Sequence, residues 1–234
     1  MAAIYLIRHG QASFGKANYD QLSDKGIEQS QMLGRAWNSE SSPTLCFTGT
    51  MKRHGQTHQG FYDGQPNSAV LPTVLSELNE FDHEEILIKY NENWKNVEYM
   101  NQLYRQKPDP KASFNEDFVL AIKRWMSEKY QDEYNENWLQ FKQRCLNGFE
   151  QVIEQSKQST TKHDHIAVFS SGGTISVILA NILGLNDLAS LKLNQQIRNT
   201  SVSKILFSGN NISVDFFNNY SHLSASDPSW ATYR

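Results

Sequence analysis

The chain has 234 residues, 38% of them hydrophobic, and a formal net charge of −3. This length suits one large core, and the weakly negative, mixed charge gives no reason to expect nucleic acid or an anionic membrane as partner. No apolar run approaches the roughly 20 residues that span a bilayer, no charged leader precedes the first predicted strand, and the two cysteines, Cys46 and Cys145, lack neighbours at metal-ligand spacing. We therefore expect a cytoplasmic protein with buried, reduced thiols and neither a metal nor a cofactor; the sequence indicates no oligomeric state.

The first predicted element is an apolar strand over residues 4–7, which ends at Arg8-His9-Gly10. Its β-branched and aromatic residues fit a buried central strand, and open α/β sheets bind ligands at the carboxyl ends of such strands. Arg8 can bind two anionic oxygens, a neutral His9 can attack phosphorus, and Gly10 lets the backbone approach a ligand closely. This tripeptide predicts a site that handles phosphate.

The next elements place further charged groups at strand ends. A helix is predicted over residues 24–39, capped by Ser23 or Asp24. A strand over 44–48 is followed by a polar stretch that holds Arg53, and a short strand over 69–71, extending past Pro72 toward Leu75, is followed by an acidic run with Glu77 and Glu80. One strand end thus offers a guanidinium and another offers carboxylates.

Residues of about 84–135 differ from the rest in composition. They are rich in Asn, Glu, Lys, Tyr and Trp and show no strand-like alternation, so we predict a helical lid insertion within a single domain, 1–234. The aromatic side chains of this segment either anchor its helices or shape a substrate pocket. They are Trp94, Tyr99, Tyr104, Trp125, Tyr130 and Tyr134.

In the last third of the chain, the sequence again predicts strands of the central sheet. A helix over 135–157 leads to a strand over 165–169, which ends in Ser170-Ser171-Gly172-Gly173 before an apolar helix. A strand, a glycine turn and a helix form a natural anion site, because free amides and the helix dipole point at the turn. A hairpin over 202–207 and 212–217 then closes the sheet, and the polar tail after Leu223 is expected to be loose.

Several short sequence motifs follow one another along the chain. They are Arg8-His9-Gly10-Gln11, Leu22-Ser23-Asp24-Lys25-Gly26 with Gln29, Arg53 with Gln56-Thr57, Leu78-Asn79-Glu80, Gly172-Gly173, and Asn218-Asn219-Tyr220-Ser221-His222-Leu223. In this order and spacing the chain resembles the histidine phosphatase superfamily, the phosphoglycerate mutase-like proteins. The resemblance implies an α/β fold, a three-layer α/β/α sandwich with a mostly parallel central sheet.

The resemblance also implies roles for individual residues. His9 would be the nucleophile and would carry a phosphohistidine, Arg8 and Arg53 would bind the phosphoryl group, and Glu80 would be the proton donor, with Glu77 as the alternative acid. The other substrate-binding positions would be Gln11, Ser171 and Gly172. His222 matches a family landmark and is expected to support the fold.

Two departures from the family pattern bear on the rate. Ser171 stands where members usually carry a second histidine, and Gly15 stands where they often carry an asparagine. Losing one preorganised donor costs roughly 3 kcal/mol of transition-state stabilisation, about two orders of magnitude in rate. His54, His83 and Lys16 are candidates to replace it.

We predict a metal-independent phosphoric monoester hydrolase of the histidine acid type, which acts slowly on a small phosphorylated substrate. A non-catalytic module that binds a phospho-ligand is the alternative from a different class. A phosphoglycerate-type mutase, which must retain the phosphohistidine until it returns the group to an intermediate, ranks third.

Overall fold

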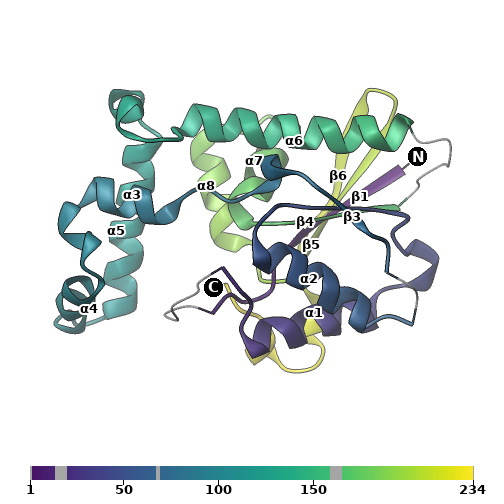
Figure 1. Cartoon of the computed structure of the whole chain (residues 1–234), viewed down its shortest axis with the longest axis horizontal. Helices are drawn as coiled ribbons and strands as arrows, with labels where there is room; N and C mark the ends of the chain where they lie inside the picture. The colour runs from purple at the N-terminus through teal and green to yellow at the C-terminus, as the bar shows by residue number, and fades with distance from the viewer. Residues whose placement is uncertain (1, 14–19, 67–68, 159–164, 234) are drawn as a thin grey trace. The chain divides into compact units, whose positions relative to one another are not determined.

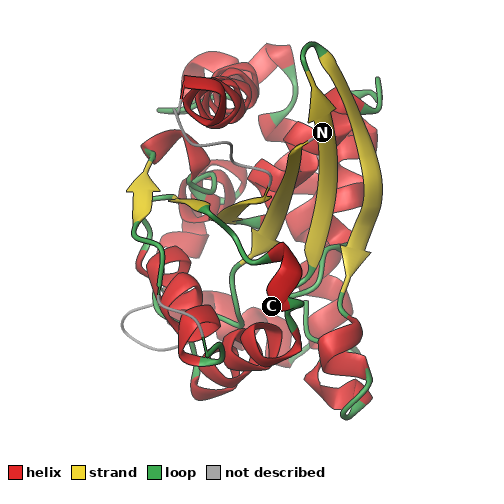
Figure 2. Cartoon of the chain, turned by 90° about the vertical axis from the view of Figure 1, so that its right-hand side faces the viewer, coloured by secondary structure: helices red, strands yellow, loops and turns green. Residues whose placement is uncertain are grey.

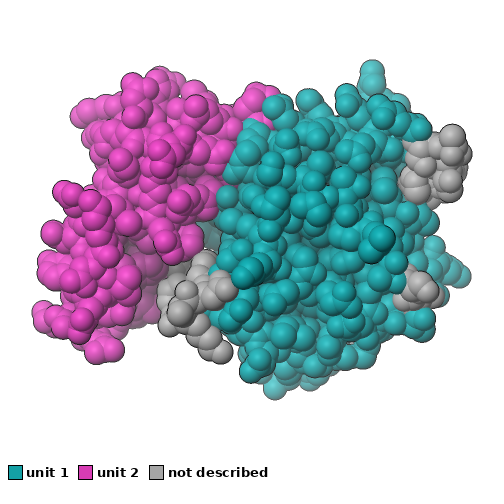
Figure 3. All heavy atoms as spheres, viewed as in Figure 1, with its two compact units in different colours: residues 1–80, 144–234 teal, residues 81–143 magenta. Residues whose placement is uncertain are grey.

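The computed structural model describes residues 2–13, 20–66, 69–158 and 165–233. The chain forms two compact units, Met1–Glu80 with Arg144–Arg234, and Phe81–Gln143 (Figure 3). The first unit contains the sheet and all the strand ends singled out above, and the second is helical.

The first unit is built on one six-stranded sheet (Figures 1 and 2). Its strands are β1 (Ala2–Arg8), β2 (Leu45–Thr48), β3 (Pro72–Val74), β4 (His165–Ser170), β5 (Val202–Ser208) and β6 (Asn211–Asn219). They lie in the order β3-β2-β4-β1-β5-β6. The first four in this order run parallel, β5 is antiparallel to β1, and β6 is antiparallel to β5. The sheet is mostly parallel, as predicted.

Helices cover both faces of the sheet, and the alternation of β1 shows how. Ile4 and Leu6 face one core, with apolar residues of α6 (Trp138–Gln158) and α7 (Gly172–Ile182). Tyr5 and Ile7 face the other, with apolar residues of α1 (Asp24–Ala36) and α2 (Lys52–Asp63). Because successive side chains of a strand point to opposite faces, a strand that is apolar throughout must be covered on both sides. The three-layer α/β/α sandwich is confirmed.

Several predicted elements have different bounds, among them the third strand and the first helix. The third strand begins at Pro72 and not at Ala69. This strand is at the edge of the sheet, where a proline, which lacks a backbone N–H, is tolerated as the first residue. The helix predicted over 24–39 ends at Ala36, and Trp37 already has extended backbone. Ser23 caps this helix by accepting a hydrogen bond from the Gly26 amide.

The prediction of a loose C-terminal tail is wrong. After α8 (Asp187–Gln196) and the hairpin, the chain forms α9 (Ser221–Ser224) and the short helix η5 (Pro228–Trp230). Gln29 of α1 donates hydrogen bonds from its side-chain amide to the Trp230 carbonyl and the Thr232 hydroxyl. The Arg198 guanidinium lies 3.2 Å from the centre of the Tyr233 ring. The tail is therefore held by contacts with residues far from it in sequence, and amino-acid composition does not reveal such contacts.

The second unit contains α3 (His83–Tyr90), η3 (Glu92–Lys95), α4 (Val97–Arg105), α5 (Pro110–Trp125), η4 (Glu128–Glu133) and the first residues of α6. Of the six aromatic residues named above, four are buried, namely Trp94, Tyr104, Trp125 and Tyr134, whereas Tyr99 is exposed. The rings of Trp94 and Tyr104 lie 6.1 Å apart, and those of Trp125 and Trp138 lie 5.4 Å apart. Most of these aromatics thus anchor helices to one another. The function of this unit as a lid stays a prediction.

Both cysteines are free and buried. Burial raises the pKa of the Cys46 thiol to about 11. Within the described part of the chain, every helix is too short or too polar to cross a bilayer.

Candidate active site

The four strand ends that the sequence singles out meet at one edge of the sheet. β3, β2, β4 and β1 are neighbours and parallel, so their carboxyl ends point the same way. Each strand leads to a predicted site residue: Arg8 ends β1 and His9 follows it, Ser171 follows β4, and Arg53 and Glu80 lie in the segments that come after β2 and β3. The four strand ends therefore form the edge at which the sequence predicts ligand binding, and ligand binding there stays a prediction.

His9 is buried, and its protonation is fixed by two features. Its Nδ1 lies 2.7 Å from the Gly10 carbonyl oxygen, which can only accept, so Nδ1 carries the proton and Nε2 keeps its lone pair. Burial, followed by the charges of Arg53 and Arg8, lowers the pKa of His9 well below its usual 6.5. The imidazole is thus neutral at physiological pH and presents an unprotonated nitrogen, the form that can attack phosphorus.

The backbone of His9 is held from three sides. Its amide donates to the Ser170 carbonyl, and its carbonyl accepts from the amide of Thr200 and the side-chain amide of Asn199. Thr200 in turn has its hydroxyl 3.0 Å from Nε2 of His222. His222 therefore supports the loop that holds His9, which fits the fold-supporting function expected for it.

Arg8 reaches the glycine turn that follows β4. One of its terminal nitrogens donates to the Ile197 carbonyl, and its Nε lies 3.5 Å from the point that a β-carbon on Gly172 would occupy. Because the charge of Arg8 also acts on His9, the guanidinium lies close to both the imidazole and the turn. A glycine at 172 keeps this approach open.

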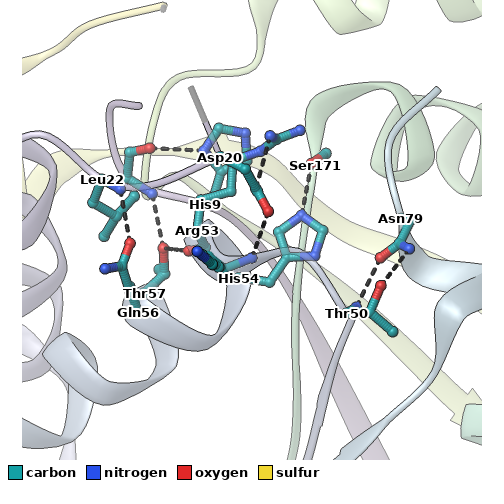
Figure 4. A network of polar contacts seen from close by, with 12 residues as sticks. His9, Asp20, Leu22, Thr50, Arg53, His54, Gln56, Thr57, Asn79 and Ser171 are labelled. Carbon is teal, nitrogen blue, oxygen red and sulfur yellow. Dashed lines mark hydrogen bonds and ion pairs between the residues drawn. The ribbon is translucent and has the colours of Figure 1, made fainter. Parts of the chain in front are cut away.

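Arg53 is buried on α2, and its charge is the largest electrostatic effect on His9. Its Nη1 lies 3.1 Å from a carboxylate oxygen of Asp20, whose other oxygen accepts from the Lys52 amide (Figure 4). Sequence reasoning missed Asp20, since a single aspartate 33 positions before Arg53 gives no signal. The Asp20 side chain is partly exposed, whereas that of Arg53 is buried.

The two candidate acids occupy different places. One carboxylate oxygen of Glu80 accepts from the Gly173 amide at 3.0 Å, at the first turn of α7. Glu77 instead accepts from the Ser76 hydroxyl, and its β-carbon packs against Gly148 of α6. The structure places Glu80 on the glycine turn and Glu77 beside α6.

The segment before Glu80 is fixed by residues that the sequence does not single out. Nη1 of Arg144 donates to the carbonyls of Ser76, Glu77 and Asn79, at 3.3, 3.1 and 2.9 Å. The Asn79 side chain exchanges two hydrogen bonds with Thr50. Arg144 is one of many polar residues along α6, so sequence periodicity could not have identified it.

Ser171 and His54 contact one another and are both fully buried. The Ser171 hydroxyl oxygen lies 2.7 Å from Nε2 of His54, and Figure 4 shows the two side chains turned toward each other. The His54 ring centre is 5.9 Å from that of His9. Burial, followed by the charge of Arg53, lowers the pKa of His54 to about 3, so this imidazole is neutral too.

The remaining predicted positions are distributed as follows. Gln11 accepts from the Ser23 hydroxyl through its side-chain oxygen, at the start of α1; its part in substrate binding stays a prediction. His83 begins α3 in the second unit. Gly15 and Lys16 lie outside the described residues. Across the ranges that the structure describes, no three His, Cys, Asp or Glu side chains gather as metal ligands would.

The site combines a neutral histidine that has an unprotonated nitrogen with two arginines and a glycine turn, at the carboxyl edge of parallel strands. This combination defines a class of protein, an α/β protein with a site suited to a phosphoryl-type anion. The family described as "Histidine phosphatase superfamily (branch 1)" matches residues 4–126 and 82–220. These two matches cover most of the chain, which therefore belongs to the histidine phosphatase superfamily. No curated protein matches the sequence significantly.

Solved structures share the fold at low identity. An α-ribazole phosphatase from Shigella flexneri is 18% identical, with a TM-score of 0.60, and the alignment covers 93% of this chain and 96% of that one. A phosphoserine phosphatase from Entamoeba histolytica, in complex with 3-phosphoglyceric acid, is 15% identical, with a TM-score of 0.63 and coverages of 95% and 100%. A phosphoglycerate mutase from Bacillus anthracis is 14% identical, with a TM-score of 0.64 and coverages of 95% and 95%.

Proposed function

We propose that this protein is a metal-independent phosphomonoester hydrolase that acts through a phosphohistidine on His9. The observation that carries the proposal is the protonation state of the His9 ring. Its Nδ1 donates to the Gly10 carbonyl, and its Nε2 is unprotonated under the influence of burial and the positive charges of Arg53 and Arg8. A neutral imidazole held between cations is arranged to attack a phosphoryl group that those cations bind. The family supports phosphatase-type chemistry.

The proposed reaction has two balanced steps. In the first, Nε2 of His9 forms a bond to phosphorus while the bond to the leaving oxygen breaks, and protonated Glu80 gives its proton to the leaving alcohol. Arg8 and Arg53 bind the oxygens of the phosphoryl group throughout. In the second step, Glu80 takes a proton from water, whose oxygen attacks phosphorus and releases inorganic phosphate and neutral His9.

The proposed substrate is a small phosphorylated molecule. Structural relatives include a phosphoserine phosphatase, an α-ribazole phosphatase and a phosphoglycerate mutase, which share a compact phosphomonoester as their reacting group. We propose that the helical unit Phe81–Gln143 acts as the lid that selects among such molecules.

The test is turnover of p-nitrophenyl phosphate by wild type and His9→Ala. We expect the variant to lose measurable turnover while its circular dichroism stays native, and EDTA to leave the wild-type rate unchanged. Rapid quenching of the wild type with labelled substrate should trap label on His9. Turnover by His9→Ala would contradict the proposal.

The same measurements distinguish the two alternatives. A module that only binds phospho-ligands would bind vanadate but form no phosphoenzyme. A mutase would return the label from His9 to an organic acceptor and release little inorganic phosphate. Release of one phosphate for each substrate consumed is the result expected of a hydrolase.

A further inference from the structure

The contact between His54 and Ser171 joins two elements at the proposed phosphoryl site. His54 is in the first turn of α2, and Ser171 is the residue before α7. Both are fully buried, and 2.7 Å separates Nε2 from the hydroxyl oxygen. Arg53 precedes His54 and Gly172 follows Ser171, so each partner of the contact is adjacent in sequence to a proposed anion-binding feature.

The direction of this hydrogen bond follows from the other ring nitrogen. Nδ1 of His54 is buried and has no hydrogen-bond partner among the described residues, and it lies against Gly49. A neutral imidazole carries one proton, and a buried N–H without a partner is rarer than a buried acceptor without one. The proton is therefore on Nε2, and His54 donates to the Ser171 oxygen.

This direction leaves the Ser171 proton available. A hydroxyl has one proton to donate and two lone pairs, and His54 occupies one lone pair. Ser171 makes no side-chain capping bond at the start of α7, unlike the residues that cap α1 and α8. Its proton is thus available to an acceptor at the turn, where Arg8 lies near Gly172 and Glu80 accepts from the Gly173 amide.

We propose that His54 is a positioning residue that orients and polarises the Ser171 hydroxyl as a donor to an oxygen of the phosphoryl group. This inference rests on the proposed phosphatase function and explains how the site works without the second histidine. Hydrogen bonds in a chain strengthen one another, so a serine backed by an imidazole N–H is a better donor than a serine alone.

Charge explains why a neutral pair suits this pocket. Arg8 and Arg53 already place two positive charges near His9 and lower its pKa. A third cation would be repelled by both guanidinium groups. The charge of Arg53 and burial keep His54 neutral, so the His54–Ser171 pair supplies a donor without adding charge.

The first experiment measures protons and not activity. In the wild-type protein with ¹⁵N-labelled histidine at pH 7, we expect the proton of His54 on Nε2 and that of His9 on Nδ1, with signals assigned by their loss in His54→Gln and His9→Ala. A proton on Nδ1 of His54 would overturn the inference, and would instead make Nε2 an acceptor that could activate Ser171 as a nucleophile. The reading for His9 is separate and tests the proposed function.

The second experiment is a double-mutant cycle on turnover of p-nitrophenyl phosphate. We expect Ser171→Ala to lower kcat about 100-fold, His54→Leu to lower it about tenfold, and the double variant to match Ser171→Ala, because His54 acts only through the hydroxyl. Ser171→Thr and His54→Gln, which keep a donor, should recover part of the loss. Losses that multiply in the double variant would overturn the inference.

His58→Leu is the matched control. His58 is a second buried histidine of α2, and it bonds the Val70 carbonyl, so its loss should lower the melting temperature and leave kcat unchanged. Phosphoenzyme on His9 must still form in every variant of the cycle. Its absence from the wild type would instead mark a failure of the proposed function, whatever the cycle gives.

Discussion

The two glutamates three residues apart, Glu77 and Glu80, are predicted to differ sharply in function. Glu80 accepts from the Gly173 amide at the glycine turn. The pKa of Glu77 is below its usual value, chiefly because its own backbone amide donates to it, with help from Gln151 and Ser76. A carboxylate that stays ionised and lies beside α6 is a poor proton donor.

We predict that Glu80→Gln lowers kcat/KM, which reports the phosphorylation of His9 and not its later hydrolysis, about 100-fold or more for an alkyl phosphate, the range of general acid catalysis. For p-nitrophenyl phosphate the loss should be much smaller, since p-nitrophenolate leaves without a proton. Glu77→Gln is the isosteric control and should change neither rate by more than about twofold. Equal losses for both substrates would show that Glu80 does not protonate the leaving group.

How much of the site was predictable depends on the sequence distance of each contact. Arg8, His9 and Gly10 are consecutive, so one strand end revealed them. His54 and Ser171 are 117 positions apart, and Asp20 and Arg53 are 33 apart. Neither pair has a local signature, because each forms only when the parallel strands bring their carboxyl ends together.

At the scale of elements, the loop after β1 packs closely against the start of α1. A β-carbon on Gly10 would lie 2.4 Å from the Gly26 carbonyl oxygen, and one on Gly26 would lie 2.2 Å from the Gln11 carbonyl oxygen. The two glycines therefore allow strand and helix to approach closely, and the same loop carries the carbonyl that holds the His9 proton.

Gly10→Ala is predicted to destabilise the fold by about 1–3 kcal/mol, the usual cost of overpacking, and to lower kcat at least tenfold, because the Gly10 carbonyl must move. Gly55→Ala is the control: this glycine is on the exposed side of α2, with open space where the β-carbon would go. Alanine there should stabilise the helix by up to about 1 kcal/mol. Urea unfolding and kcat measure both; a Gly10→Ala protein with wild-type stability would contradict the packing argument.

Sequence periodicity predicted elements to the extent that each element is locally regular. The strands β1 and β4, each with a continuous apolar run, and the hairpin of β5 and β6 follow from local patterns. The start of β3 at Pro72 and the docked segment around η5 do not. The start of β3 depends on its position at the edge of the sheet, and the docking of the segment around η5 depends on hydrogen bonds from α1. Neither cause can be recognised from the local sequence.

For the whole molecule, buried neutral histidines predict a loss of stability in acid. Burial lowers the pKa of His222 to about 4, and burial with the charge of Arg53 lowers that of His54 to about 3, from an ordinary 6.5. Below pH 6.5 the unfolded chain therefore binds protons that the folded chain does not. The free energy of unfolding should fall as the pH drops from 6.5 toward 4, by up to about 1.4 kcal/mol per pH unit for each histidine.

Urea unfolding at pH 7.5, 6, 5 and 4.5 measures this slope. His54→Gln and His222→Gln remove one titrating group each, so each variant should lose less stability than the wild type between pH 6.5 and 4.5. Other groups titrate equally in the three proteins and cancel in the difference. Parallel curves would show that these histidines are protonated in the folded state as readily as in the unfolded one.

The order of strands has a consequence for biosynthesis. β1 is made before the other strands of the sheet, and its two neighbours, β4 and β5, begin only at residues 165 and 202. A nascent chain that has only reached the end of α5 (Pro110–Trp125) already contains Arg8, His9 and Gly10, but neither strand that pairs with β1. Such long-range pairing is slow and leaves apolar strands exposed until it forms. The histidine that we propose as nucleophile is therefore synthesised long before the two strands that fix its position.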